Sequence, residues 1–220
     1  MWCSARRRAA VMLAFGGLLV SSSAHAGNQI YEPMAASVQS QLQGAVADQA
    51  HPRLVFDSEE QADHWMTEMS KRLRRHLPDE HYRREFLTSV QYEAKRAGLD
   101  PQLVLGIIDI ESKFRKYAVS SAGARGYMQV MPFWRKVIGS PDHNLFRMRT
   151  NLRYGCLILR HYMDIERGNL VRALGRYNGS LGRMEYPNLV MAAWKRWAYS
   201  YKPKQVSNQP PPLNYRGASE

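Results

Sequence analysis

One carboxylate near the middle of the chain has neighbours that suit it for proton transfer. Glu111 follows Val104 by seven residues and Ile107 by four, so helical spacing places all three on one face of a helix. That face is apolar, and Glu111 falls in the last turn, at the negative pole of the helix. Both surroundings oppose ionisation of a carboxyl group. We therefore expect a raised pKa at Glu111, as a general acid requires.

The residues that follow this carboxylate bear on whether it belongs to a site or to a simple ion pair. Pairing with Lys113 or Arg115 is the alternative, because structural ion pairs also perturb carboxylates. The glycines of segment 123–126, however, allow a tight turn and a close approach of the backbone to a ligand. Ser120 and Gln129 are neutral groups that can hold a polar substrate through hydrogen bonds. The segment therefore favours a ligand cleft beside the carboxylate.

A long, ordered motif runs through this region. It reads Glu-Ser-Lys-Phe at 111–114 and Ser-Ser-Ala-Gly-Ala-Arg-Gly-Tyr-Met-Gln-Val-Met-Pro at 120–132. The motif resembles that of the lytic transglycosylases of the soluble-type, goose-lysozyme-like family. The resemblance covers about half of the chain, roughly Phe86 to Trp197, and departs from the family at Tyr127, where Leu is usual. Further matches are Asn151 with Gly155, Tyr177-Asn178 and Tyr186-Pro187.

The resemblance implies cleavage of the β-1,4 bond between N-acetylmuramic acid and N-acetylglucosamine in peptidoglycan glycan strands. In the family one glutamate, here Glu111, protonates the glycosidic oxygen. It then accepts a proton from the C6 hydroxyl of the muramic acid residue, which attacks C1. The product carries a 1,6-anhydromuramic acid end, and neither a metal nor an organic cofactor is implied. The residues implied in substrate binding are Ser120, Met128, Gln129, Tyr177 and Asn178.

Two features of this implied site have simpler alternatives. By the resemblance, Tyr177 donates a hydrogen bond near Glu111 or the acetamido group, but a buried tyrosine with a satisfied hydroxyl is the commoner case. Most glycoside hydrolases use two carboxylates. Asp109 should point to another side of the helix, and Asp100 is expected to cap its start. A mechanism with one acid therefore fits the sequence better.

Other functions stay open on the sequence alone. A lysozyme-like peptidoglycan hydrolase would share the motif and differ in consuming water. A non-catalytic cell-wall-binding or assembly protein could keep the fold. The net charge of +12 should draw the protein to acidic wall polymers or anionic lipid surfaces, and a basic surface could dock a cell-envelope protein partner. Nucleic acid is not an expected partner, because the chain has no recognised nucleic-acid motif and its cations are scattered.

The start of the chain resembles a secretory signal. Residues 6–8 are three arginines, the apolar run 9–20 is too short to span a bilayer, and Ala24-His25-Ala26 is a cleavage pattern. The sequence therefore predicts an exported, periplasmic protein that is cleaved after Ala26 and keeps no transmembrane anchor. Loss of the three arginines lowers the net charge to +9. Cys156 is then the single cysteine left, and its helical spacing predicts a core residue.

Hydrophobic periodicity predicts an all-α chain, in which a lysozyme-like catalytic domain follows extra N-terminal helices. Helices are expected at about 58–77, 79–97, 101–111, 128–138 with an interruption near Pro132, 145–166 and 170–177, and from Pro187 onward. The expected parts are a signal peptide at 1–26, a flexible lead at 27–56 with a short helix near Met34–Val46, an N-terminal helical extension at 57–82, the lysozyme-like transglycosylase domain at 83–200 and a Pro-rich disordered tail at 201–220.

Overall fold

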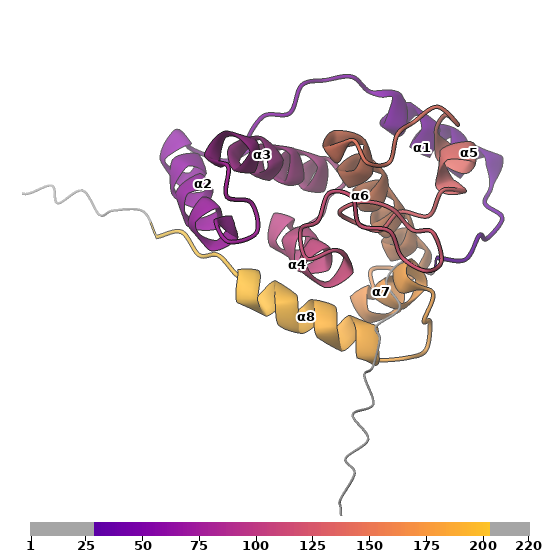
Figure 1. Ribbon diagram of the computed structural model, residues 1–220. Helices are drawn as coiled ribbons and strands as arrows, with labels where there is room; N and C mark the ends of the chain where they lie inside the picture. Colours follow the sequence, from indigo (N-terminus) through magenta and orange to yellow (C-terminus); the bar gives the residue numbers. More distant parts are fainter. Residues whose placement is uncertain (1–28, 203–220) are drawn as a thin grey trace, which may run out of the picture.

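The computed structural model describes residues 29–202 (Figure 1). Within that range the chain forms eight α-helices and no β-strand, so the all-α fold expected from the sequence is confirmed. The signal peptide expected at 1–26 lies outside the described residues, as does the expected tail from residue 203 onward. The helices are α1 (Ala36–Ala47), α2 (Glu59–Leu73), α3 (Glu80–Arg96), α4 (Pro101–Glu111), α5 (Trp134–Ile138), α6 (Met148–Ile165), α7 (Leu170–Asn178) and α8 (Glu185–Trp197).

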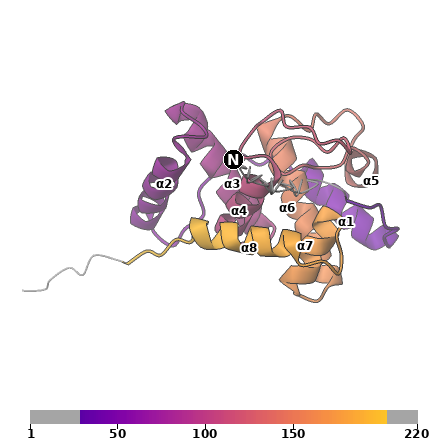
Figure 2. The same cartoon turned by 60° about the horizontal axis from the view of Figure 1, so that its bottom comes forward.

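Helix α4 is the central element, and it packs between α3 and α8 (Figures 1 and 2). The sequence predicted a single buried face, but every residue from Leu103 to Ile108 is buried. A helix that is apolar all round belongs in a core. Gly106 makes this possible, because a Cβ atom there would lie 2.8 Å from the backbone nitrogen of Trp194. The backbones of α4 and α8 therefore approach more closely than any larger residue would permit.

A buried charge cluster holds the N-terminal residues against the helical body. Glu93 of α3 is 2% exposed and pairs with Arg153 of α6 at 3.1 Å and with Arg96 at 3.4 Å. Arg153 also donates 2.9 Å to the carbonyl of Val46, in the last turn of α1, where a cation is favoured. The short helix expected near Met34–Val46, within the flexible lead 27–56, is confirmed as α1, and it packs on α5 and α6. The division into domains stays a prediction.

Several helix starts agree with the sequence, and three helices are shorter than expected. The cap expected at Asp100 is confirmed, and the side chains of Ser58 and Asp79 likewise accept a backbone N–H at the start of α2 and α3. The helix expected at 58–77 ends at Leu73. The helix expected at 128–138 is wrong in its first half, where antiparallel bridges at Arg125 hold the chain in turns, and only α5 forms. The helix expected at 145–166 starts three residues later, at Met148.

Candidate functional site

The sequence of α4 places Glu111 at the C-terminal end of the helix, which is buried. Asp100 caps the first turn by accepting 2.8 Å from the Gln102 backbone N–H, and Pro101 stands at the first helical position. The helix ends after Glu111, where Lys113 and Phe114 adopt positive φ angles of 52° and 59°. This reversal buries the Phe114 ring, which is 2% exposed. Its packing against Phe86 and Trp197 offsets the cost of two left-handed residues.

The Glu111 carboxyl group is almost completely enclosed. It is 5% exposed, and its Oε1 accepts a 2.5 Å hydrogen bond from the Tyr186 hydroxyl. Its Oε2 is buried and has no hydrogen-bond partner in the described part of the chain. Burial raises the pKa of Glu111 to about 8, and the hydrogen bond from Tyr186 opposes that rise only in part. Glu111 is therefore protonated at neutral pH, and its Oε2 makes no hydrogen bond within the described residues.

The interpretation of Glu111 as a surface ion pair is wrong. Lys113 pairs instead with Asp109 at 3.0 Å, and Arg196 of α8 pairs with the other oxygen of Asp109. Arg115 donates from Nε to the Ser112 carbonyl at 3.0 Å. Asp109 therefore points away from Glu111 toward the surface cations, as its position on the helix predicted.

The loop after α4 is braced by its own polar side chains. Gln129 adopts a φ of 48° and is 1% exposed, and its amide nitrogen donates to the carbonyls of Ala118 at 3.1 Å and Gly126 at 2.9 Å. Ser120 accepts 3.1 Å from the Ala124 backbone N–H, which closes the turn between them. Both residues, expected to bind substrate, thus have a structural role as well. Their part in substrate binding stays a prediction.

Met128 is held in place from two helices. Its backbone N–H donates 2.8 Å to Oδ1 of Asn151 on α6, and its carbonyl accepts 2.7 Å from the Tyr177 hydroxyl on α7. The Asn151 amide nitrogen also donates to the carbonyls of Arg125 and Leu145. These contacts give a physical reason for the asparagine of the matched helix motif: one side chain binds Arg125 and Met128 of the loop and Leu145 of the segment before α6.

The second residue of that helix motif makes room for the loop. A Cβ atom at Gly155 would lie 2.4 Å from the Met128 sulfur and 2.7 Å from its Cβ. Cys156, next to it, is fully buried, as its helical spacing predicted. The α6 surface is therefore shaped to receive the Met128 side chain, which is itself completely buried.

Three residues from α7 and α8 complete the site. Tyr177 is fully buried, and both burial and the nearby Glu111 carboxylate raise its pKa, so its hydroxyl keeps its proton. Asn178 is 8% exposed at the end of α7, where Gly179 adopts a φ of 79° and turns the chain. Tyr186 lies in the first turn of α8 and supplies the hydroxyl that contacts Glu111. The Tyr186-Pro187 match was the one signal in the sequence for this residue, and it indicated no role for the hydroxyl, whose partner lies 75 residues away.

Tyr127, where the sequence departs from the motif it resembles, faces the core. It is 1% exposed, its hydroxyl lies 2.7 Å from that of Tyr82, and its ring packs 4.8 Å from that of Phe86. The larger side chain is thus accommodated by α3.

Two general properties concern residues 29–202. No group of three or more His, Cys, Asp or Glu side chains in this range is placed to hold a metal ion. None of the helices described there combines the length and apolar character that crossing a bilayer requires.

Comparison with known proteins agrees with this geometry. The family model of the transglycosylase SLT domain matches residues 88–193. The membrane-bound lytic murein transglycosylase C of Actinobacillus pleuropneumoniae serotype 5b is 44% identical over 90 residues, which cover 37% of this chain and 25% of that protein. The protein of the same name from Glaesserella parasuis serovar 5 is 39% identical over 90 residues, with the same coverage.

The chain spans about a quarter of the length of the curated relatives that it matches. The region compared agrees with the all-α, lysozyme-like fold expected from the sequence. Residues 88–193, and with them Glu111, Tyr177 and Tyr186, belong to the transglycosylase SLT family.

Proposed function

We propose that this protein is a peptidoglycan lytic transglycosylase and that Glu111 is its single acid and base. One observation carries the proposal. Within the SLT region, the Glu111 carboxyl group is buried, has a pKa of about 8 and is held by Tyr186 through one oxygen only. A general acid works best when its pKa lies near the operating pH, and a raised carboxyl pKa meets that condition.

The proposed reaction has two steps that balance in protons. First, the protonated Glu111 gives its proton to the glycosidic oxygen, the bond from that oxygen to C1 of N-acetylmuramic acid breaks, and the acetamido group of the same sugar stabilises C1. Second, the Glu111 carboxylate takes the proton of the C6 hydroxyl while that oxygen bonds to C1. The products are a free N-acetylglucosamine end and a 1,6-anhydromuramic acid end. No water is consumed, and no metal ion is needed.

Other residues are proposed to prepare the carboxyl group and bind the sugar. Tyr186 positions Oε1 of Glu111, which leaves Oε2 for the proton transfers. Tyr177 orients the Met128 backbone beside the acid. Substrate binding is assigned to Ser120, Met128, Gln129, Tyr177 and Asn178, from the motif that they share with the family.

Digestion of purified sacculi tests the proposal. The purified protein should release muropeptides with anhydromuramic ends, identified by mass spectrometry, and Glu111→Gln should lower the rate by about 10²–10⁴-fold or more. Asp109→Asn is the matched control, because Asp109 lies on the same helix but pairs with surface cations. Reducing muramic ends would instead establish a hydrolase. Binding to sacculi without release by either protein would establish a non-catalytic wall-binding protein.

We further propose that the protein acts in the cell envelope, after export and removal of residues 1–26. The wall substrate and the charged, apolar and small-residue segments of the chain start support this location. N-terminal sequencing of protein recovered from the periplasm should begin at Gly27. An intact N-terminus in the cytoplasmic fraction would contradict it.

A further inference from the structure

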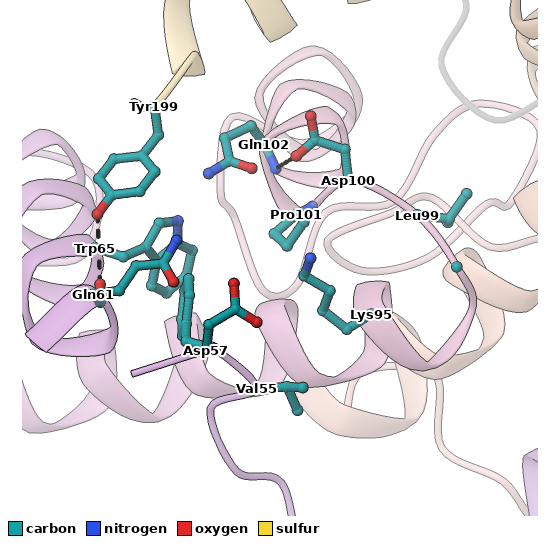
Figure 3. A pocket seen from close by; sticks show the side chains of 12 residues that line it. Val55, Asp57, Gln61, Trp65, Lys95, Leu99, Asp100, Pro101, Gln102 and Tyr199 are labelled. Carbon is teal, nitrogen blue, oxygen red and sulfur yellow. Dashed lines mark hydrogen bonds between the residues drawn. The ribbon is translucent and has the colours of Figure 1, made fainter. Parts of the chain in front are cut away.

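A pocket of about 560 Å³ lies at the N-terminal end of α4, opposite to the end that carries Glu111 (Figure 3). Its lining comes from three parts of the chain: 55–65, which precedes the SLT region, 95–102, which lies inside it, and Tyr199, which follows it. Residues outside the SLT region therefore complete a pocket that this region would not form by itself. Its volume is in the range of binding sites for small molecules.

Hydrogen bonds fix the walls of this pocket. The Val55 backbone exchanges two bonds with the Gln91 side chain, at 3.0 Å through its N–H and 2.5 Å through its carbonyl. On the opposite wall, the Tyr199 hydroxyl lies 3.0 Å from Nδ1 of His64 and donates to the Gln61 carbonyl at 3.4 Å. Trp65 is completely buried between these walls. The pocket therefore keeps its shape without a ligand.

The lining includes Asp100 and Gln102, and the Asp100 carboxylate accepts from the Gln102 backbone N–H and from Trp194 Nε1. Three further polar side chains face the pocket from different elements: Asp57, Gln61 and Lys95 (Figure 3). The structure shows no hydrogen bond or ion pair for their terminal groups within the described residues, although Asp57 and Lys95 carry opposite charges. A carboxylate, an amide and an ammonium group that face one space can each bind a different part of one ligand.

We propose that this pocket binds a short peptide that carries both an ammonium and a carboxylate group, which is the chemistry of peptidoglycan stem peptides. Lys95 would pair with the carboxylate and Asp57 with the ammonium group, while the Gln61 amide bonds to a peptide group. The assignment to stem peptides rests on the proposed function, but binding of a zwitterionic peptide does not. An uncharged glycan strand offers no group of opposite charge to Asp57 or to Lys95, so these two residues favour a peptide over a sugar as the ligand.

The pocket would act as an anchor away from the chemistry. Helix α4 has 11 residues, which corresponds to a length of about 16 Å between the pocket and the acid. A stem peptide held there would be close to, but separate from, a glycosidic bond at Glu111. The enzyme would then bind peptide-bearing peptidoglycan more tightly than glycan stripped of its peptides.

An NMR titration of the ¹⁵N-labelled protein tests the proposal directly, because the Trp65 indole lines the pocket. The probe is the tripeptide N-acetyl-L-Ala-γ-D-Glu-L-Lys, in which the lysine amine is the single ammonium group, and its matched probe has this amine acetylated as well. The tripeptide should shift the Trp65 indole signal saturably, and the acetylated probe should bind about threefold to fivefold more weakly, as for the loss of one exposed ion pair. Asp57→Asn and Lys95→Gln should each have an effect of the same size.

Asp63→Asn and Lys71→Gln are the control variants, because both residues are exposed and neither lines the pocket. They should leave the tripeptide affinity unchanged. The proposal is overturned by the absence of a saturable shift, by equal affinity for both probes, by unchanged affinity in Asp57→Asn and Lys95→Gln, or by a shift with an N-acetylglucosamine oligosaccharide alone. If the protein binds the tripeptide but forms no anhydromuramic ends, the proposed function is contradicted and the proposed peptide site is supported.

Discussion

The Tyr186 hydroxyl donates a 2.5 Å hydrogen bond to Oε1 of Glu111 and thereby joins the first turn of α8 to the last residue of α4. Burial keeps the Tyr186 pKa well above its usual value, so this hydroxyl remains a donor over the whole physiological pH range. The close packing of α4 on α8 at Gly106 sets the distance between the two helices. The carboxyl group is therefore oriented by a contact that depends on the whole helix pair.

Replacement of Tyr186 by Phe should change both the rate and its pH dependence. The hydrogen bond favours the charged form of Glu111, so its loss should raise the Glu111 pKa further. A hydrogen bond to a charged group contributes about 1.5–3 kcal/mol, which corresponds to about one to two pKa units. We expect the alkaline limb of the kcat/KM profile to move up by about one unit and the rate to fall about tenfold.

Tyr154→Phe is the control for this variant, because it removes a buried hydroxyl that contacts His143 at 2.7 Å rather than Glu111. Its pH profile should match that of the wild-type protein. If the alkaline limb stays in place in Tyr186→Phe, the limb does not report on Glu111 and the positioning role of Tyr186 is wrong.

Glu111→Gln should stabilise the protein at neutral and alkaline pH. The Glu111 pKa is about 8 in the folded chain against an ordinary value of 4.5, so the folded state holds this proton more tightly than the unfolded state. The free energy of unfolding is therefore undiminished below pH 4.5 and falls as the pH rises from 4.5 to 8, by on the order of 5 kcal/mol at most. The amide variant lacks this fall. Urea unfolding of the variant and the wild-type protein at pH 4 and pH 8 measures this fall. If the two unfolding free energies differ by the same amount at both pH values, burial of the ionisable group is contradicted.

Tyr177→Phe separates two roles of one hydroxyl. In the structure this hydroxyl donates to the Met128 carbonyl, so its loss leaves a buried acceptor without a partner and should cost about 1–3 kcal/mol of unfolding free energy. Because substrate binding is also assigned to Tyr177, kcat/KM should fall about tenfold under conditions where the variant is folded, as for the loss of one hydrogen bond. A loss of stability with an unchanged kcat/KM would contradict the assignment of substrate binding.

Asn151→Asp should loosen the loop while keeping the shape of the side chain. Oδ1 would still accept the Met128 N–H, but the second oxygen would face the carbonyls of Arg125 and Leu145, to which the amide nitrogen now donates. We expect a loss of about 2–4 kcal/mol, because two hydrogen bonds become contacts between acceptors. Thermal unfolding measures the loss. Asn169→Asp, which changes a helix-cap asparagine outside this loop, should have little effect.

Local sequence signals were sufficient to predict α4 and its acid. The Asp100 cap, the apolar spacing and the position of Glu111 in the last turn all agree with the structure, because each depends on residues within one helix. The raised pKa also agrees, although its cause is burial on every side of α4 rather than on one face.

Contacts between distant segments could not be predicted in the same way. Nothing near Tyr186 indicates that its hydroxyl meets Glu111, and the turns at 128–132 replace a helix only because Arg125 bridges back to Val130. The same holds for the buried Glu93–Arg153 pair, which docks the residues expected to form a flexible lead. Each of these depends on how helices come together, which periodicity does not encode.

Digestion of sacculi in H₂¹⁸O tests the central claim most directly. If Glu111 takes the proton of the C6 hydroxyl while that oxygen bonds to C1, the new muramic ends should contain no ¹⁸O and should be lighter by one water than hydrolytic ends. Glu111→Gln should release almost none of these ends. Incorporation of one ¹⁸O atom at each new muramic end would contradict transglycosylation. An undiminished rate in Glu111→Gln would contradict the assignment of the acid.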